Sequence, residues 1–149
     1  MSDRSVAPEV VSIRIPSRLD LLSVLDGVAV ALCDRMRFDS DTTSQVTMSV
    51  IEAGTNAIQH AHRRNAALPV DVRFQLLPDR LEIDVTDSGP GFDPELVNGD
   101  VTSPEHILDA RGRGIFIMRA CMDSVDFEFL PSGTVCHLVK LRPPQAAAS

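Results

Sequence analysis

Two pairs of alternating segments constrain the fold of this chain most strongly. Residues 69–77 (PVDVRFQLL) and 81–86 (LEIDVT) alternate apolar and polar side chains and flank the turn-forming run PDR. Residues 124–130 (SVDFEFL) and 134–141 (TVCHLVKL) repeat the pattern around PSG. Alternation places the apolar side chains on one face of a strand, and a short linker joins neighbouring strands into a hairpin. The sequence therefore predicts two antiparallel hairpins, each with one buried face.

The remaining periodic segments predict one more strand and three helices. Residues 11–15 (VSIRI) alternate, and Ser17 can cap a helix over residues 18–36. The polar run FDSDTTS precedes a second helical pattern at 42–64, and GIFIMRACMD (114–123) forms a shorter one. The order β-α-α-β-β-α-β-β predicts an α+β fold, a two-layer α/β sandwich. Its sheet would be mixed but mostly antiparallel, with the helices on one face.

Length and charge limit the organisation and the partners. A chain of 149 residues suits one domain, predicted over residues 11–142, with flexible ends at 1–10 and 143–149. The net charge of −7 argues against a broad basic surface, so direct nucleic-acid or membrane binding is not expected. The three cysteines are widely spaced without a CxxC motif and more simply pack in the core, which favours a reduced, cytoplasmic protein.

The irregular segment at residues 88–111 interrupts the pattern of strands and helices. It begins with the stretch DSGPGFDP (87–94) and ends in the glycine cluster DARGRG (109–114). Long loops in compact domains are usually functional or mobile. Glycine lets a ligand approach the backbone closely, and Gly114 could lie at a helix N-terminus, where amides bind phosphate. Taken singly, each glycine cluster is more simply explained by an ordinary turn.

Glu52, Asn56 and His60 form a polar stripe on the second predicted helix, because they are spaced i, i+4, i+8. A carboxylate in such a position can accept a proton from an attacking hydroxyl group or water. An amide oxygen is a hard ligand that suits Mg²⁺. For this stripe alone, a solvated helix face is the simpler explanation. The pair His60 and His62 does not predict a metal site, since residues two apart do not share a helix face.

The order of these three motifs resembles the GHKL superfamily of ATP-binding proteins, which has the Bergerat fold. The chain is most similar to the small bacterial anti-sigma-factor serine kinases. The likeness rests on VIEAGTNAIQHA, DSGPGFDP and GRGIFIMRACMDSV, and it extends over residues 11–141. Two positions depart from that pattern. Ala61-His62 stands where Gly-Tyr is frequent, and Leu25-Asp26 stands where an arginine that touches the partner would be expected.

The resemblance implies roles for individual residues. Glu52 would be the general base, Asn56 the Mg²⁺ ligand, and Asp87 the acceptor for the adenine amino group. Residues 95–111 would form a lid over the triphosphate, and Thr134 would lie near the base. The full set expected to bind ATP with Mg²⁺ is Asn56, His60, Asp87, Gly89, Gly91, Arg111, Gly112, Arg113, Gly114, Ile115 and Thr134.

The resemblance also implies an activity and partners. The chain would be an ATP-dependent serine-protein kinase that phosphorylates a STAS-domain anti-anti-sigma protein and sequesters a sigma factor. A homodimer would be expected, with the first strand and first helix as plausible contributors. An alternative is a non-catalytic switch, in which Mg-ATP orders the lid and changes the protein partner. A structural domain without a ligand would require three ordered motifs to coincide by chance.

Overall fold

The computed structural model describes residues 7–89 and 110–144, which form a five-stranded sheet covered by helices. The strands are β1 (Glu9–Pro16), β2 (Pro69–Leu76), β3 (Arg80–Asp87), β4 (Ser124–Leu130) and β5 (Gly133–Leu141). They lie in the order β1-β2-β3-β5-β4, and every neighbouring pair is antiparallel. The predicted hairpins are β2–β3 and β4–β5. The expectation of a mostly antiparallel two-layer fold is confirmed.

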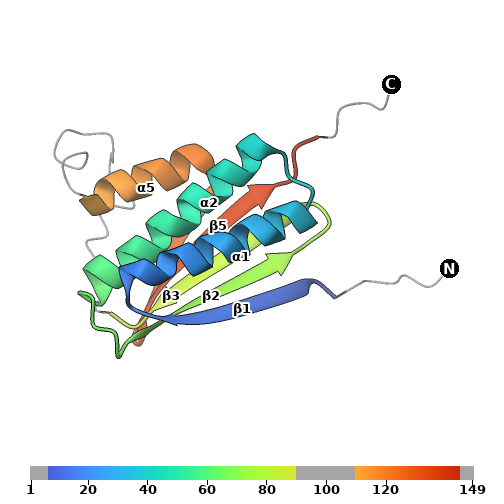
Figure 1. Ribbon diagram of the computed structural model, residues 1–149. Coiled ribbons are helices and arrows are strands. Elements are labelled where there is room, and N and C mark those ends of the chain that lie inside the picture. Colours follow the sequence, from blue (N-terminus) through green and yellow to red (C-terminus); the bar gives the residue numbers. More distant parts are fainter. Residues whose placement is uncertain (1–6, 90–109, 145–149) are drawn as a thin grey trace, which may run out of the picture.

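Three helices lie on one face of the sheet (Figure 1). A 3₁₀ turn, η1 (Leu19–Leu21), leads into α1 (Leu22–Arg35). The second helix, α2 (Ser40–Thr55), continues into a π-helical turn, η2 (Asn56–Ala61). The third, α5 (Ala110–Cys121), packs beside α2. None of the helices in the described ranges is long and apolar enough to cross a membrane.

The core lies between the two layers and follows from the alternation. In β2 the side chains of Val70, Val72 and Phe74 are buried, whereas Arg73 between them is exposed. The helices contribute the apolar positions of their periodic stripes to the same core. Large side chains that are fully buried there are Leu25, Val46, Val50, Ile58, Leu81, Ile83, Ile115, Met118 and Leu138.

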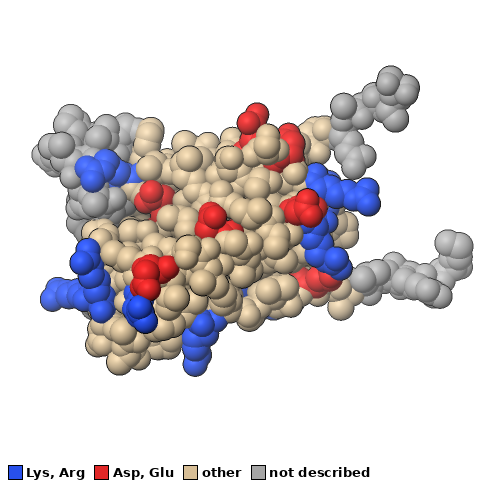
Figure 2. All heavy atoms as spheres, viewed as in Figure 1, with Lys and Arg blue, Asp and Glu red and all other residues tan. Residues whose placement is uncertain are grey.

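The opposite face of the sheet carries polar and charged side chains. Arg14 of β1 pairs with Asp71 of β2, with Nε 2.7 Å from Oδ1. On β5, His137 lies between Asp84 of β3 and Glu128 of β4. On the helix-covered side, acidic side chains are scattered, and Lys and Arg gather toward the two ends of the view (Figure 2). No continuous basic surface is visible among the described residues on that side.

The helix boundaries differ from those predicted, for local reasons. The second helix begins at Ser40 because Asp39 is its N-cap and accepts a hydrogen bond from the Thr42 N–H at 2.7 Å. It changes to a π turn at Asn56, well before the predicted end at residue 64. The cap predicted for the first helix is wrong. Arg18 is the N-cap residue of η1, and Ser17 hydrogen-bonds elsewhere.

Candidate functional site

The predicted site residues that the structure describes gather at one end of the two layers. At this end α2 passes into η2, β3 finishes at Asp87, β5 begins, and α5 starts (Figure 1). Exposed arginines at this end include Arg63 and Arg64 after η2 and Arg113 in α5. Segments that are distant in sequence therefore meet here, with basic side chains around them.

Glu52 and Asn56 face the first turns of α5. A Cβ atom built on Gly114 would lie 2.9 Å from Glu52 Oε2 and 3.5 Å from both side-chain polar atoms of Asn56. Any larger side chain at position 114 would therefore displace the Glu52 carboxylate. The i, i+4 spacing predicted this shared face correctly, and the glycine allows α5 to approach it.

The sequence predicted that the third helix begins at Gly114, but α5 begins at Ala110, so Gly114 lies within the helix and not at its N-terminus. The chain is already helical at Ala110, so Gly112 and Gly114 both belong to α5. Glycine is needed at position 114 because α5 packs closely on α2 and leaves no room for a side chain there. Its role is therefore to allow this close packing and not to form a loop. The backbone amides at the start of α5 nevertheless lie in the first turn of a helix, the usual place for phosphate binding.

The environment of Glu52 suits a proton acceptor. Partial burial between α2 and α5 raises the pKa of its carboxyl group, and the nearby Arg113 guanidinium opposes this rise. A raised pKa brings a carboxylate closer to the working pH of a general base. Perturbed carboxyl groups in a cleft between elements are typical of functional sites, although structural groups can also be perturbed.

The π turn η2 carries the end of the predicted polar stripe. Asn56 begins it and His60 lies within it. A π turn closes i→i+5 hydrogen bonds, so it is wider than an α turn and changes the direction in which His60 projects relative to Glu52. Single π turns inside α-helices are frequent at functional sites. The predicted role of His60 in nucleotide binding stays a prediction.

Asp87 and Thr134 form the second half of the site, at the end of the sheet. They are cross-strand neighbours on β3 and β5. Asp87 Oδ1 accepts a hydrogen bond from the Gly89 N–H at 3.0 Å. Gly89 itself lies against η2, since a Cβ there would be 2.6 Å from the Ala61 carbonyl oxygen. These contacts hold the Asp87 backbone close to the end of the second helix.

Thr134 provides a test of whether these residues fit an adenine nucleotide. Its hydroxyl group is buried and has no hydrogen-bond partner within the part of the chain that the structure describes. An unsatisfied buried hydroxyl group is costly, so it points to a polar ligand or a water molecule at this position. The neighbouring Asp87 carboxylate can accept several hydrogen bonds. An acceptor beside a hydroxyl group matches the polar edge of adenine, so the residues present fit the predicted cofactor.

The other predicted residues are placed as follows. Gly112 is buried, Arg113 is exposed, and the Ile115 side chain is fully buried in the core, so Ile115 could contribute only its backbone to a ligand. Gly91 and residues 95–109 of the predicted lid lie outside the described residues. Arg111 belongs to α5.

Sequence reasoning missed three residues at this end of the molecule. His62 and Ser17 are buried and hydrogen-bonded to each other. Gly133 has φ of +152°, and a Cβ there would be 1.8 Å from the Asp87 carbonyl oxygen. The turn-forming residues Ser132-Gly133 could have indicated a special backbone conformation at Gly133. Nothing in the local sequence indicates that Ser17 and His62 are partners.

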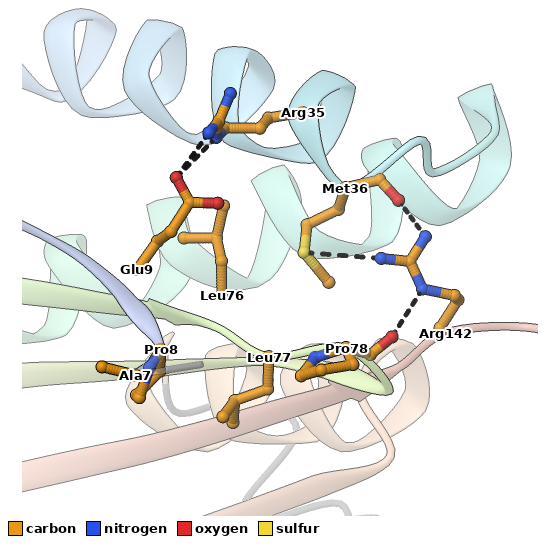
Figure 3. A pocket seen from close by; sticks show the side chains of 9 residues that line it. All are labelled: Ala7, Pro8, Glu9, Arg35, Met36, Leu76, Leu77, Pro78 and Arg142. Atoms are coloured by element: carbon orange, nitrogen blue, oxygen red, sulfur yellow. Dashed lines mark hydrogen bonds and ion pairs between the residues drawn. The ribbon is translucent and has the colours of Figure 1, made fainter. Parts of the chain in front are cut away.

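A hollow lies at the opposite end of the sheet and contains none of the predicted site residues (Figure 3). Its two guanidinium groups are engaged in structural contacts. Arg35 pairs with Glu9, and Arg142 donates to the carbonyl oxygens of Pro78 and Met36. These bonds tie β1, α1 and the segment after β5 together, which makes the hollow a structural junction.

Comparisons with known proteins identify the family and the fold of the chain. Residues 15–140 match the family model of the histidine kinase-like ATPase domain. A serine-protein kinase RsbW of Bacillus licheniformis is 30% identical over 139 residues, covering 90% of this chain and 86% of the relative. The RsbW of Bacillus subtilis is 29% identical over 120 residues, covering 77% and 75%. The catalytic domain of the histidine kinase ThkA superposes with a TM-score of 0.58 at 17% identity, covering 91% of this chain and 99% of that domain.

Proposed function

The chain belongs to the histidine kinase-like ATPase family, and on that basis we propose that it is an ATP-dependent serine-protein kinase that acts as an anti-sigma factor. Its substrate would be a serine of a STAS-domain anti-anti-sigma protein, and its second partner a sigma factor. The placement of Glu52 and Asn56 against Gly114 of α5 carries the proposal, because it brings a carboxylate that could accept a proton close to an amide oxygen that could bind Mg²⁺.

Each residue has a distinct task in the proposed reaction. ATP supplies the phosphoryl group, and Mg²⁺ neutralises its charge. Asn56 would hold the metal ion, while Asp87 and Thr134 would bind the adenine edge. Glu52 would accept the proton that the target serine loses as its oxygen bonds to phosphorus. Phosphoryl transfer depends mainly on positioning and charge stabilisation, so a protein with these few groups can catalyse it.

Arg113 supports this division of tasks. Its positive charge opposes the rise in the pKa of the Glu52 carboxyl group, so it keeps that group available in the ionised form. Arg113 is also exposed at the start of α5, where a phosphate would meet backbone amides. The chain contains a single lysine, Lys140, whose Nζ donates to the Cys121 carbonyl oxygen at the other end of α5. Arginine and backbone amides would therefore bind the phosphates.

We also propose that the protein works as a homodimer in the cytoplasm. All three cysteines are free thiols, as is usual in a reducing compartment. Light scattering at several protein concentrations would test the dimer, and a monomer at all concentrations would contradict it.

Calorimetric titration with a non-hydrolysable ATP analogue and Mg²⁺ tests the nucleotide site. We expect binding by the wild type and its loss in Asp87→Ala. The matched control is Asp84→Ala, which removes a carboxylate from the same strand on the opposite face of the sheet and should leave binding unchanged. Equal affinity of the Asp87 variant and the wild type would contradict the adenine role.

Phosphoryl transfer to a purified STAS-domain protein then tests the kinase activity. Mass spectrometry should detect one phosphoserine that appears only with ATP and Mg²⁺. Nucleotide binding without any phosphoserine would instead support the non-catalytic switch.

A further inference from the structure

His62 links three separate segments through its two ring nitrogens. Its Nδ1 lies 2.8 Å from Ser17 Oγ, between β1 and η1. Its Nε2 accepts the Ser88 backbone N–H at 2.9 Å and lies 3.3 Å from Ser88 Oγ. Ser17 Oγ also donates to the Leu68 carbonyl oxygen at 2.6 Å. Ser17 is 1% exposed and His62 is 3% exposed, so the bond between them is shielded from water, whereas the bond of His62 to the exposed Ser88 is only partly buried.

The partners determine which nitrogen of His62 carries the proton. The Leu68 carbonyl group can only accept, so the Ser17 hydroxyl hydrogen points to it, and Ser17 Oγ accepts from His62 Nδ1–H. The Ser88 backbone N–H can only donate, so His62 Nε2 must present its lone pair. Both ends therefore require the same neutral tautomer, with the proton on Nδ1.

The bond to Ser88 fixes the backbone that carries Asp87. Ser88 N–H is held by His62, and the next amide, that of Gly89, donates to Asp87 Oδ1 at 3.0 Å. On the other side, Asp87 pairs with Thr134 across the sheet. Asp87, the residue that would bind adenine, is therefore fixed by two contacts. Its strand pairs with β5 in the sheet, and the next residue is hydrogen-bonded to His62 in the helix layer.

We propose that His62 is a positioning residue for adenine recognition, which holds the Ser88 amide and thereby sets the direction of the Asp87 carboxylate. This inference rests on the proposed nucleotide site. It assigns a task to the histidine that occupies the position where similar proteins often carry tyrosine. His62 would not touch the nucleotide, so its effect would pass entirely through Ser88 and Asp87.

Two substitutions separate the two hydrogen bonds of His62. In His62→Gln the amide oxygen can take the place of Nε2 and accept from Ser88 N–H, but the bond to Ser17 is lost. In His62→Asn the shorter amide can take the place of Nδ1 and donate to Ser17, but it does not reach Ser88. Each variant removes one bond of the same side chain, the buried bond to Ser17 in His62→Gln and the partly buried bond to Ser88 in His62→Asn, so both should lose some stability.

Affinity for ATP and GTP analogues, measured by calorimetry, tests the proposal. We expect His62→Gln to keep the wild-type preference for ATP within about twofold. His62→Asn should reduce that preference about five- to tenfold, the effect of one lost hydrogen bond. Ser88→Ala is the matched control, because it removes the 3.3 Å hydroxyl contact and keeps the amide, so its preference should match the wild type.

The possible results separate the two proposals. If the wild type binds ATP and the Gln and Asn variants have the same nucleotide preference, the positioning role is wrong and the nucleotide site stands. If the wild type does not bind ATP, both proposals fail. If the variants do not fold, ¹⁵N NMR of the wild type can identify which ring nitrogen of His62 carries the proton. A proton on Nε2 and none on Nδ1 would mean that His62 cannot accept the Ser88 N–H, and the proposal would be overturned.

Discussion

At the scale of single residues, Glu52 links the electrostatics of the site to its chemistry. Its carboxyl group is partly buried against α5, and this desolvation raises its pKa, while Arg113 opposes the rise. The burial makes the ionised form of Glu52 unfavourable in the folded protein. In the proposed reaction the same burial would prepare the group to accept a proton, so a gain in function would coincide with a loss in stability.

Replacing Glu52 with Gln should separate these two effects. We expect phosphoryl transfer to fall at least about 100-fold, the usual contribution of a general base, while the affinity for the ATP analogue stays within about twofold. Quantification of phosphoserine formation and calorimetry would measure the two quantities. A parallel loss of binding and transfer would contradict the assignment of Glu52 as the base.

The same variant should be more stable than the wild type at neutral pH. Because the folded state raises the pKa of Glu52, ionisation costs stability as the pH rises from the unfolded pKa through the folded one. Gln carries no such cost, so its advantage in urea unfolding should be present at pH 7 and vanish below about pH 4, where the carboxyl group is protonated in both states. An advantage that persists at low pH would point to packing instead.

The motif residues could be predicted from the sequence, but the residues that position them could not. Glu52 and Asn56 share a face because helical spacing fixes it. Ser17 was interpreted as a helix cap because serine before a helical pattern usually is one. Its actual partners, His62 and Leu68, are distant in sequence, and only the folded chain brings them together.

At the scale of elements, the end of α1 carries a residue in a conformation that favours glycine. Arg37 follows the C-cap residue Met36 and has φ of +59°. The turn is closed by a hydrogen bond from the Phe38 N–H to the Cys33 carbonyl oxygen. Glycine is the usual residue at this position of a helix terminus, because a Cβ atom is strained there.

Arg37→Gly should therefore stabilise the protein by about 1 kcal/mol. Chemical denaturation would measure the change. The control is Ala31→Gly, at an exposed position inside the same helix, which should destabilise by about 1 kcal/mol because glycine has a low helix propensity. Destabilisation by both substitutions would show that the Arg37 side chain contributes more than its backbone strain costs.

Three strands are joined on the open face of the sheet by His137. Burial alone would lower the pKa of His137, but hydrogen bonds to Asp84 and Glu128 raise it overall. Asp126, its cross-strand neighbour on β4, also lies on this face, and Arg73 is the cross-strand neighbour of Asp84 on β2. The imidazolium form therefore binds β3 to β4 across β5.

The contribution of His137 should depend on pH in a defined direction. A raised folded pKa stabilises the protein fully below the unfolded value of about 6.5, and this stabilisation is lost as the pH rises through the folded pKa. The difference in unfolding free energy between the wild type and His137→Gln should thus be largest near pH 5.5 and shrink above neutrality. A difference independent of pH would contradict an ionic contribution.

Prediction from sequence was strongest for strands and weakest for helix ends. Alternation identified β2, β3, β4 and β5, since a two-residue period is read directly from the chain. The change from α2 to the π turn at Asn56 has no comparable local signal. It places Ala61 against Gly89, a contact with a segment that follows much later in the sequence.

At the scale of the whole molecule, the candidate site is assembled from both halves of the chain. Glu52 and Asn56 come from the first half, Asp87 from the middle strand, and Gly114 and Thr134 from the second half. The element order could be predicted from the sequence, and the family resemblance supplied the overall fold. The order of the strands in the sheet could not, because pairing between β3 and β5 depends on contacts across the segment between them.

A nucleotide that contacts all of these elements should stabilise the entire domain. At a free concentration about 100 times its Kd, the ATP analogue should add about 2.7 kcal/mol to the unfolding free energy. Thermal unfolding should then shift upward by roughly 5–10 °C. Asp87→Ala should show no shift under the same conditions. A wild-type protein with no shift at saturating analogue would contradict binding to the folded domain.

The strand order has a consequence for synthesis on the ribosome. β5 follows every other strand along the chain, yet it is inserted between β3 and β4. Until it emerges, β3 has one unpaired edge, and β4 has no neighbour in the sheet. The nascent chain therefore exposes a strand edge that can pair wrongly with other chains. The sheet can close only after residue 141 has left the exit tunnel, so the central pairing of β3 with β5 is the last of the described strand pairings that can form during synthesis.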